Sequence, residues 1–276
     1  MRRMARAALL GLASPAARAS PRSFAGLPRR ARSHAAHASP PAPTAPDVRG
    51  ATLRWVDAHV IGLNLCPFAR APRVADGIRL VVSEATGVDA LFAEFHAEAE
   101  RLAATYTDAD AAYDEHAEAG DDENARLSRG HSPRRRNAAA SSRTTLIAYG
   151  ALPELADDFV LFLAVAERCE AMLEESGLDA RIQLATFHPA YRFEGEEIQD
   201  PGSFTNRSPY PTMHLLRVVD VSRAIDGFEG NTEDIPAANV EVLRDVGLET
   251  LAKRLKALVA WRADEKGEDA ILSKKE

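Results

Sequence analysis

Short apolar runs alternate with helical patterns along this chain, and the alternation limits its possible folds more than any other feature. Around the runs, apolar residues recur every three or four positions, the spacing that lines one face of a helix. Strands separated by amphipathic helices are typical of an α/β layer. We therefore expect a single domain of α/β (or α+β) class, in which amphipathic helices cover a mixed sheet of roughly four strands. The expected strands are residues 78–82, 144–149, 181–187 and 213–219, and the expected helices are residues 51–63, 88–102, 155–173, 236–246 and 248–261.

The first fifty residues differ in composition from the rest. They contain nine arginines and one acidic residue, Asp47, among many alanines, serines and prolines. Such a composition is typical of a transit peptide. We expect residues 1–50 to be a disordered import signal for the mitochondrion or the plastid, residues 51–264 to form the domain, and residues 265–276 to be a frayed tail. The alternative for the first segment is a disordered basic tail that binds nucleic acid.

A strongly charged segment, residues 106–143, interrupts the domain. Eight acidic residues lie between Asp108 and Glu123, and six arginines without an acid follow between Arg126 and Arg143. Charge blocks of this kind cannot bury enough apolar surface to offset the entropy of the chain. We expect a disordered insertion in a loop. The alternative is that the two blocks pair with each other or recruit a partner.

The domain is acidic once its basic start is set apart. The chain carries a formal charge of −7, of which residues 1–50 contribute +8, so residues 51–276 carry −15. An acidic domain is poorly suited to the phosphate backbone of nucleic acids, and no apolar run approaches the roughly 20 residues of a membrane span. We expect a small-molecule ligand, no nucleic acid and no membrane, and the sequence leaves the oligomeric state open.

Two polar, turn-rich segments beside the last two expected strands predict a ligand site. FHPAYRF, residues 187–193, places His188 and Tyr191 at the carboxyl end of a strand, where open α/β sheets form ligand crevices. TNRSPYPTMHLLR, residues 205–217, combines polar side chains with prolines that fix the backbone. The planar guanidinium of Arg207 suits a carboxylate or a phosphate. The alternative is that Arg207 pairs with a glutamate of its own loop.

Two basic residues of the last expected strand, His214 and Arg217, are three positions apart. Side chains alternate between the two faces of a strand, so these two residues face opposite sides and cannot both enter one site. We favour His214 for the site.

The two cysteines differ in their surroundings. Cys169 lies on a helical face and is expected to be a small core residue. Cys66 lies in NLCPFA, after a helix, where a neighbouring histidine or arginine would lower its pKa and make it a nucleophile. The alternatives are a buried core thiol, or a metal site formed with His188, His214 and Glu84. Dinucleotide, P-loop, α/β-hydrolase and zincin motifs are absent, and no cofactor is identified.

Several stretches together resemble the DUF1415 family, a domain of unknown function best known from bacteria. The stretches are RWVDAHVIGLNLCPFA from Arg54, RLVVSEAT from Arg79, TTLIAY from Thr144, IQLATFHPAYRF from Ile182 and FTNRSPYPTMHLLR from Phe204. They cover most of the chain from Arg54 to about residue 255, in order. The resemblance implies a compact bacterial-type domain to which the N-terminal peptide and the charged insertion have been added, but it implies no reaction.

We expect an enzyme that acts on a small anionic metabolite, or a non-catalytic module for ligand binding or assembly, or a metal-binding protein. The expected catalytic residues are Cys66, His188 and His214. The expected ligand-binding residues are Asn64, Tyr191, Asn206, Arg207, Ser208, Tyr210 and Arg217.

Overall fold

The computed structural model of the chain describes residues 42–119 and 143–263. Most of the expected transit peptide, much of the charged insertion and the expected frayed tail lie outside these residues, so those expectations stay predictions.

Four strands form one sheet in the order β1-β2-β4-β3. β1 (Ile78–Val82) and β2 (Thr144–Ala148) are parallel, and β4 (Thr212–Arg217) is antiparallel to both of its neighbours, β2 and β3 (Ile182–Phe187). The expected four-stranded mixed sheet is confirmed.

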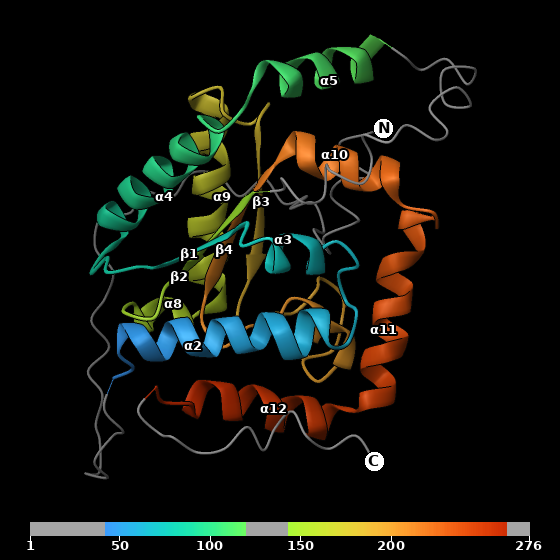
Figure 1. Cartoon of the computed structure of the whole chain (residues 1–276). Coiled ribbons are helices and arrows are strands. Elements are labelled where there is room, and N and C mark those ends of the chain that lie inside the picture. Colours follow the sequence, from blue (N-terminus) through green and yellow to red (C-terminus); the bar gives the residue numbers. More distant parts are fainter. Residues whose placement is uncertain (1–41, 120–142, 264–276) are drawn as a thin grey trace.

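Helices surround this sheet in the described part of the chain (Figure 1). In chain order the elements are α2 (Ala45–Trp55), the π-helix η1 (Val56–Ile61), α3 (Arg70–Val74), α4 (Val88–Ala103), α5 (Asp108–Ala119), α8 (Pro153–Asp157), α9 (Phe159–Glu175), the 3₁₀ turn η3 (Pro201–Thr205), α10 (Val218–Gly227), the 3₁₀ turn η4 (Thr232–Asp234), α11 (Ile235–Val246) and α12 (Leu248–Ala260).

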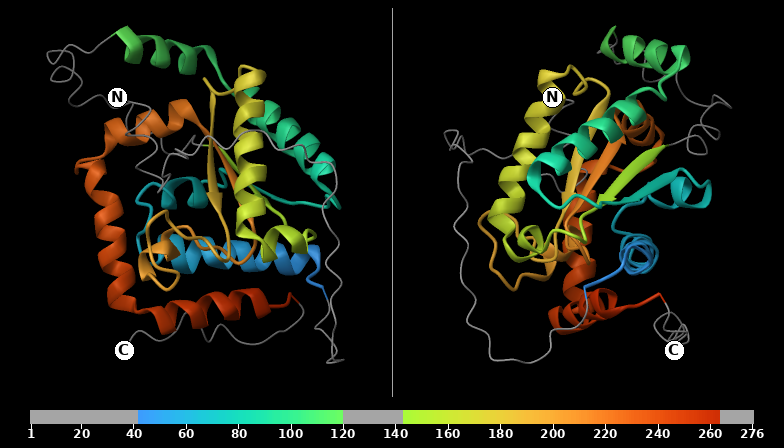
Figure 2. Two further views of the ribbon diagram at one scale, coloured as in Figure 1. Left: turned by 180° about the vertical axis from the view of Figure 1, so that it is seen from behind. Right: turned by 90° about the vertical axis from the view of Figure 1, so that its left-hand side faces the viewer.

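The two faces of the sheet carry separate apolar cores, because side chains alternate along each strand. Ile147 and Leu215 belong to the core beneath α4 and α9, whereas Leu80 and Leu146 belong to the core beneath α2. Figure 2 shows α4 and α9 on one side of the sheet and α2 on the other. A sheet covered on both faces confirms the α/β class.

The domain begins earlier than residue 51. α2 starts at Ala45, and Thr44 caps it: the hydroxyl of Thr44 accepts a hydrogen bond from the amide of Asp47 at 3.4 Å, and the Asp47 carboxylate accepts one from the amide of Thr44 at 2.7 Å. Val48 is 2% exposed in the core beneath α2. The expected boundary was wrong because composition averaged over fifty residues hid a reciprocal helix cap.

Part of the expected disordered insertion is also ordered. Residues 108–119 form α5, and Asp110, 6% exposed, is paired with arginines that come from β4 and α10. The sequence predicts a solvated acidic segment here because the arginines that pair with Asp110 lie about a hundred residues further along the chain.

The last strand is shorter than expected and is followed by a helix that the sequence did not suggest. β4 ends at Arg217, and α10 begins at Val218, whose amide donates to the carbonyl of Arg181 at 2.8 Å. The β-branched pair Val218 and Val219 extended the strand pattern. Tertiary packing of α10 overrides that local preference.

Candidate functional site

His188 is enclosed by backbone groups and aromatic rings. The side chain is fully buried, its Nε2 donates to the carbonyl of Leu155 at 2.6 Å, and its Nδ1 accepts from the amide of Ala190 at 3.0 Å. The rings of Phe159 and Phe162 lie 5.1 and 5.0 Å from the imidazole. Burial lowers the pKa of His188, against the raising effect of the hydrogen bond to Leu155. Both ring nitrogens are occupied, so His188 fixes its loop and has no nitrogen free to accept a proton.

Arg207 holds the loop that follows β3. Its Nε donates to the carbonyl of Tyr191 at 3.0 Å, its Nη2 donates to the carbonyl of Ile198 at 3.0 Å, and its guanidinium carbon lies 4.4 Å from the ring centroid of Phe204. Among the described residues, its partners are these two carbonyls and the Phe204 ring, and no loop glutamate is among them. Tyr191 packs on Phe159 with ring centroids 5.2 Å apart, and burial raises its pKa to about 12.

The other polar residues of the second motif bond to the backbone. Asn206 donates from Nδ2 to the carbonyl of Thr186 at 3.1 Å, and the Ser208 hydroxyl donates to the carbonyl of Tyr210 at 2.6 Å. Within the described residues, the buried Oδ1 of Asn206 and the buried hydroxyl of Tyr210 have no hydrogen-bond partner. This motif therefore acts first as a scaffold that joins the chain after η3 to β3.

The NLCPFA loop packs against the start of the second motif, where Leu65 and Phe204 share an apolar cluster, but it shows no sign of an activated thiol. Asn64 is exposed and has a φ of 55°, the left-handed conformation that ends the preceding π-helical turn. Burial raises the pKa of the Cys66 thiol, against the lowering effect of the backbone amides of Phe68 and Ala69. A raised pKa lowers the fraction of thiolate, the form that a nucleophile requires.

His214 lies on the opposite face of the sheet from His188. It occupies the α2 face, where its Nε2 is hydrogen-bonded to Oγ1 of Thr144 at the start of β2. The same hydroxyl donates to the carbonyl of Leu215 at 2.7 Å, so Nε2 of His214 carries the proton and donates to Thr144. Burial lowers the pKa of His214 to about 4. The three expected catalytic residues are therefore not brought together, because the sheet separates the two histidines.

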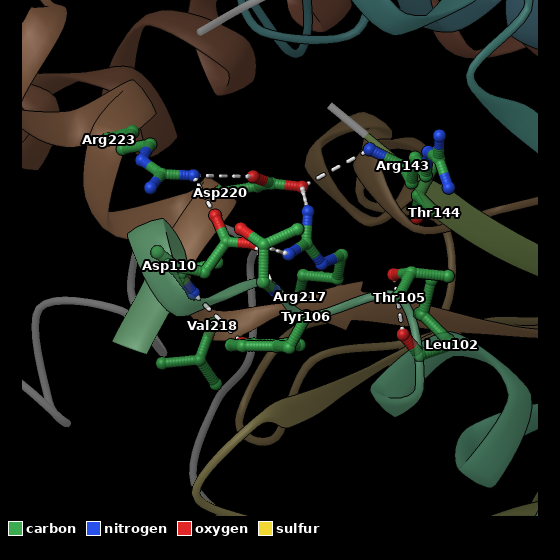
Figure 3. A network of polar contacts seen from close by, with 12 residues as sticks. Leu102, Thr105, Tyr106, Asp110, Arg143, Thr144, Arg217, Val218, Asp220 and Arg223 are labelled. Carbon is green, nitrogen blue, oxygen red and sulfur yellow. Dashed lines mark hydrogen bonds and ion pairs between the residues drawn. The ribbon is translucent and has the colours of Figure 1, made fainter. Parts of the chain in front are cut away.

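Arg217 belongs to a buried ion network (Figure 3). Its guanidinium, 4% exposed, donates to the carboxylates of Asp110 and Asp220 and lies 4.5 Å from the ring centroid of Tyr106. Arg223 pairs with the same two carboxylates. We refer to Asp110, Arg217, Asp220 and Arg223 as the ion network. The guanidinium groups of Arg217 and Arg223 are paired with these two acids, and ligand binding by Arg217 stays a prediction.

A groove of about 840 Å³ opens beside the ion network, at the end of the sheet where β1 and β2 begin. Four arginines from four different segments line it: Arg49 of α2, Arg79 of β1, Arg101 of α4 and Arg143 just before β2. Three threonine residues, Thr105, Thr144 and Thr145, also contribute to the lining. The groove lies at the opposite end of the sheet from the FHP and NRSPYP motifs. At the groove end Ile182 pairs with Arg217, whereas at the motif end Phe187 pairs with Thr212.

The groove is basic although the domain is acidic. Asp76 is the acidic residue of the lining, and Glu98 stands behind it, accepting two hydrogen bonds from Arg79 at 2.7 and 2.9 Å and lying 3.7 Å from Arg101. Four arginines against these two carboxylates leave a formal charge of +2. A concave surface with excess positive charge attracts and retains anions.

Sequence reasoning missed this groove for a physical reason. Arg49 falls in the expected transit peptide and Arg143 in the expected insertion, and no motif singles out Arg79 or Arg101. The parallel pairing of β1 with β2 brings Arg79 close to Arg143, and the packing of α2 and α4 adds Arg49 and Arg101, so no local pattern encodes the groove.

Other classes of site find no support in the described residues. Within residues 42–119 and 143–263, no three or more His, Cys, Asp or Glu side chains are grouped so as to hold a metal ion. In the same residues, no helix has the length and apolar character needed to cross a membrane.

A family model described as "Protein of unknown function (DUF1415)" matches residues 47–112 and 121–253 of the chain. No curated protein and no solved structure matches it. The start of the family match at residue 47 agrees with the start of α2 and not with a boundary at residue 51.

Proposed function

Because the chain belongs to the DUF1415 family, which is described without a function, we propose one from its geometry: the domain binds a small anionic ligand in the arginine-lined groove. The observation that carries the proposal is the convergence of Arg49, Arg79, Arg101 and Arg143 on one concavity of an otherwise acidic domain. Its volume of about 840 Å³ lies within the roughly 300–1,000 Å³ that small-molecule sites occupy.

The arginines differ in their freedom to bind an anion. Arg79 is held by both oxygens of Glu98, and Arg49 donates from Nη2 to the carbonyl of Leu80 at 2.9 Å. Among the described residues, the guanidinium of Arg143 has no partner, and in Figure 3 it points away from the ion network. Arg143 is therefore the side chain best placed to form a new bidentate contact with a phosphate or a carboxylate.

The test is an anion titration of the full chain, followed by calorimetry and thermal unfolding. Inorganic phosphate and citrate, added at constant ionic strength, are expected to bind saturably, and 100 times the dissociation constant should stabilise the fold by about 2.7 kcal/mol. Arg143→Ala should weaken anion binding about tenfold, because one pair of charge-assisted hydrogen bonds is lost. Arg192→Ala, at an exposed arginine outside the groove, is the matched control. If neither anion binds, or if both variants lose affinity equally, the proposal fails.

One observation favours enzymatic acid–base chemistry as a second candidate. His214 is half-buried and uncharged at neutral pH, and its hydrogen-bond partner Thr144 lines the groove. In the neutral ring Nε2 donates to Thr144, so Nδ1 is the nitrogen that is able to accept a proton. NMR titration of the His214 ring tests this: a pKa that stays near 4 when phosphate is added would count against it, because so weak a base holds no proton at neutral pH.

We also propose import into the mitochondrion or the plastid, supported by the nine arginines and single acid of the first fifty residues. Since Thr44 caps α2, cleavage is expected before that residue. N-terminal sequencing of the protein recovered from isolated organelles tests both points.

A further inference from the structure

The ion network reaches the groove through one backbone contact. Asp220, in the first turn of α10, accepts a hydrogen bond on Oδ2 from the amide of Arg143 at 3.1 Å. The same oxygen accepts from Nη1 of Arg217, also at 3.1 Å. Figure 3 shows Asp220 lying between Arg217 and Arg143.

Asp220 has little freedom to move. Its side chain is 7% exposed, and its second oxygen lies 3.6 Å from Nη1 of Arg223. Arg217 and Arg223 are fixed in turn by the carboxylate of Asp110. Oδ2 of Asp220 is therefore fixed by its hydrogen bond from Arg217, while Oδ1 is buried near Arg223 without a hydrogen-bond partner among the described residues, and the buried carboxylate presents a rigid acceptor to Arg143.

Arg143 is held from its other side by β1. The amide of the next residue, Thr144, donates to the carbonyl of Gly77 at 3.0 Å, and Thr144 pairs with Ile78 in the parallel register. The backbone before β2 is thus fixed at two successive amides, one bound to Gly77 and the other to Asp220. The side chain of Arg143 has no partner among the described residues and is free to enter the groove.

We infer that Asp220 is a positioning residue, which fixes the backbone of Arg143 so that its guanidinium meets an anion in the groove. The inference rests on the proposed function and adds to it a residue that is outside the groove lining. Simple electrostatics predicts the opposite effect, because a carboxylate close to an anion site repels the ligand. Asp220 therefore strengthens anion binding in the first account and weakens it in the second.

Two variants of Asp220 separate geometry from charge. Asp220→Asn keeps an oxygen at the position of Oδ2 but removes the charge, whereas Asp220→Glu keeps the charge and moves it by about 1.5 Å, the length of one carbon–carbon bond. Positioning predicts that Asp220→Asn retains phosphate affinity within about twofold. It predicts that Asp220→Glu lowers the affinity about tenfold, because one charge-assisted hydrogen bond is lost. Electrostatics predicts tighter binding for Asp220→Asn and no change for Asp220→Glu.

A double-mutant cycle identifies the residue through which Asp220 acts. In an Arg143→Ala background, the effect of Asp220→Glu on phosphate affinity should disappear, because the side chain that it positions is gone. A loss that persists in that background would show a general structural role and overturn the inference. If Arg143→Ala alone leaves phosphate binding intact, the proposed function fails instead, so the two failures are distinguishable.

One measurement on the unaltered chain keeps the inference testable even if Asp220→Glu fails to fold. The amide of Arg143 should exchange its hydrogen slowly, as a bonded amide does. Exchange at the rate of an unstructured peptide would mean that Asp220 does not hold it, and would overturn the inference.

Discussion

Arg217 donates a hydrogen bond to the carboxylate of Asp110, which lies 107 residues earlier in the chain, and both side chains are buried. This ion pair joins α5 to the end of β4. It is the contact that turns part of an apparently unstructured acidic run into a helix attached to the domain.

Removing one partner of this pair should destabilise the fold strongly. Asp110→Ala leaves the buried Arg217 with one carboxylate in place of two, and loss of one partner of a buried ion pair costs about 3–5 kcal/mol. Urea unfolding followed by circular dichroism measures the change. Asp108→Ala, at an exposed acid of the same helix turn, is the control and should change stability by no more than about 0.5 kcal/mol.

The same carboxylate should make the fold sensitive to acid. Burial raises the pKa of Asp110, but hydrogen bonds from Arg223, Thr107 and Arg217 outweigh it and lower the pKa to about 2. A depressed pKa means that the stabilisation is fully present above the unfolded value of 3.8 and is lost as the pH falls towards 2. Unfolding free energies between pH 6 and about pH 2 should fall less steeply in Asp110→Asn than in the unaltered chain. Equal slopes would contradict this prediction.

The two cysteines should differ in how fast a thiol reagent labels them, and neither should be labelled as fast as a free thiol. Cys66 is half-buried with a raised pKa, and Cys169 is fully buried with a pKa that burial raises to about 12. At pH 8, iodoacetamide should label Cys66 more slowly than a free thiol, and Cys169 only after unfolding. Mass spectrometry of timed samples measures both rates. Labelling of Cys66 faster than a model thiol would restore the nucleophile that the sequence suggested.

The start of the domain can be located by truncation. A chain that begins at residue 42 keeps the cap of α2 and the burial of Val48, whereas a chain that begins at residue 51 loses both. The cap contributes about 1 kcal/mol and the buried valine about 1.5–2 kcal/mol, so the shorter chain should be less stable by about 3 kcal/mol. It also loses the hydrogen bond from the amide of Ala263 to Asp47 at 2.8 Å. Equal unfolding midpoints for the two chains would place the boundary at residue 51 after all.

The sequence predicted the sheet well because each strand is an apolar run bounded by turn residues. It failed where a contact between distant residues decides the structure. The local pattern of Val218 and Val219 predicts a strand, but the packing of α10 makes them helical. The acidic run around Asp110 predicts a solvated segment, but the ion pair with Arg217 holds it in the fold.

The candidate site was harder to predict than the fold. The FHP and NRSPYP motifs combine residue types that often bind ligands, but His188, Asn206 and Arg207 donate to backbone carbonyls of α8, β3 and the loop after β3, respectively. The sequence cannot separate the two roles, because a side chain that holds the backbone and one that holds a ligand require the same donors and acceptors. The groove arginines lacked any local pattern, since four separate segments supply them.

The position of β4 has a consequence for how this protein is made. β4 lies between β2 and β3, yet it is the last of the four strands to leave the ribosome. Until residues 212–217 have been synthesised, β2 and β3 each expose an unpaired edge, a known starting point for aggregation. Productive folding must therefore wait until most of the chain exists, and during that interval a chaperone would have a defined segment to shield.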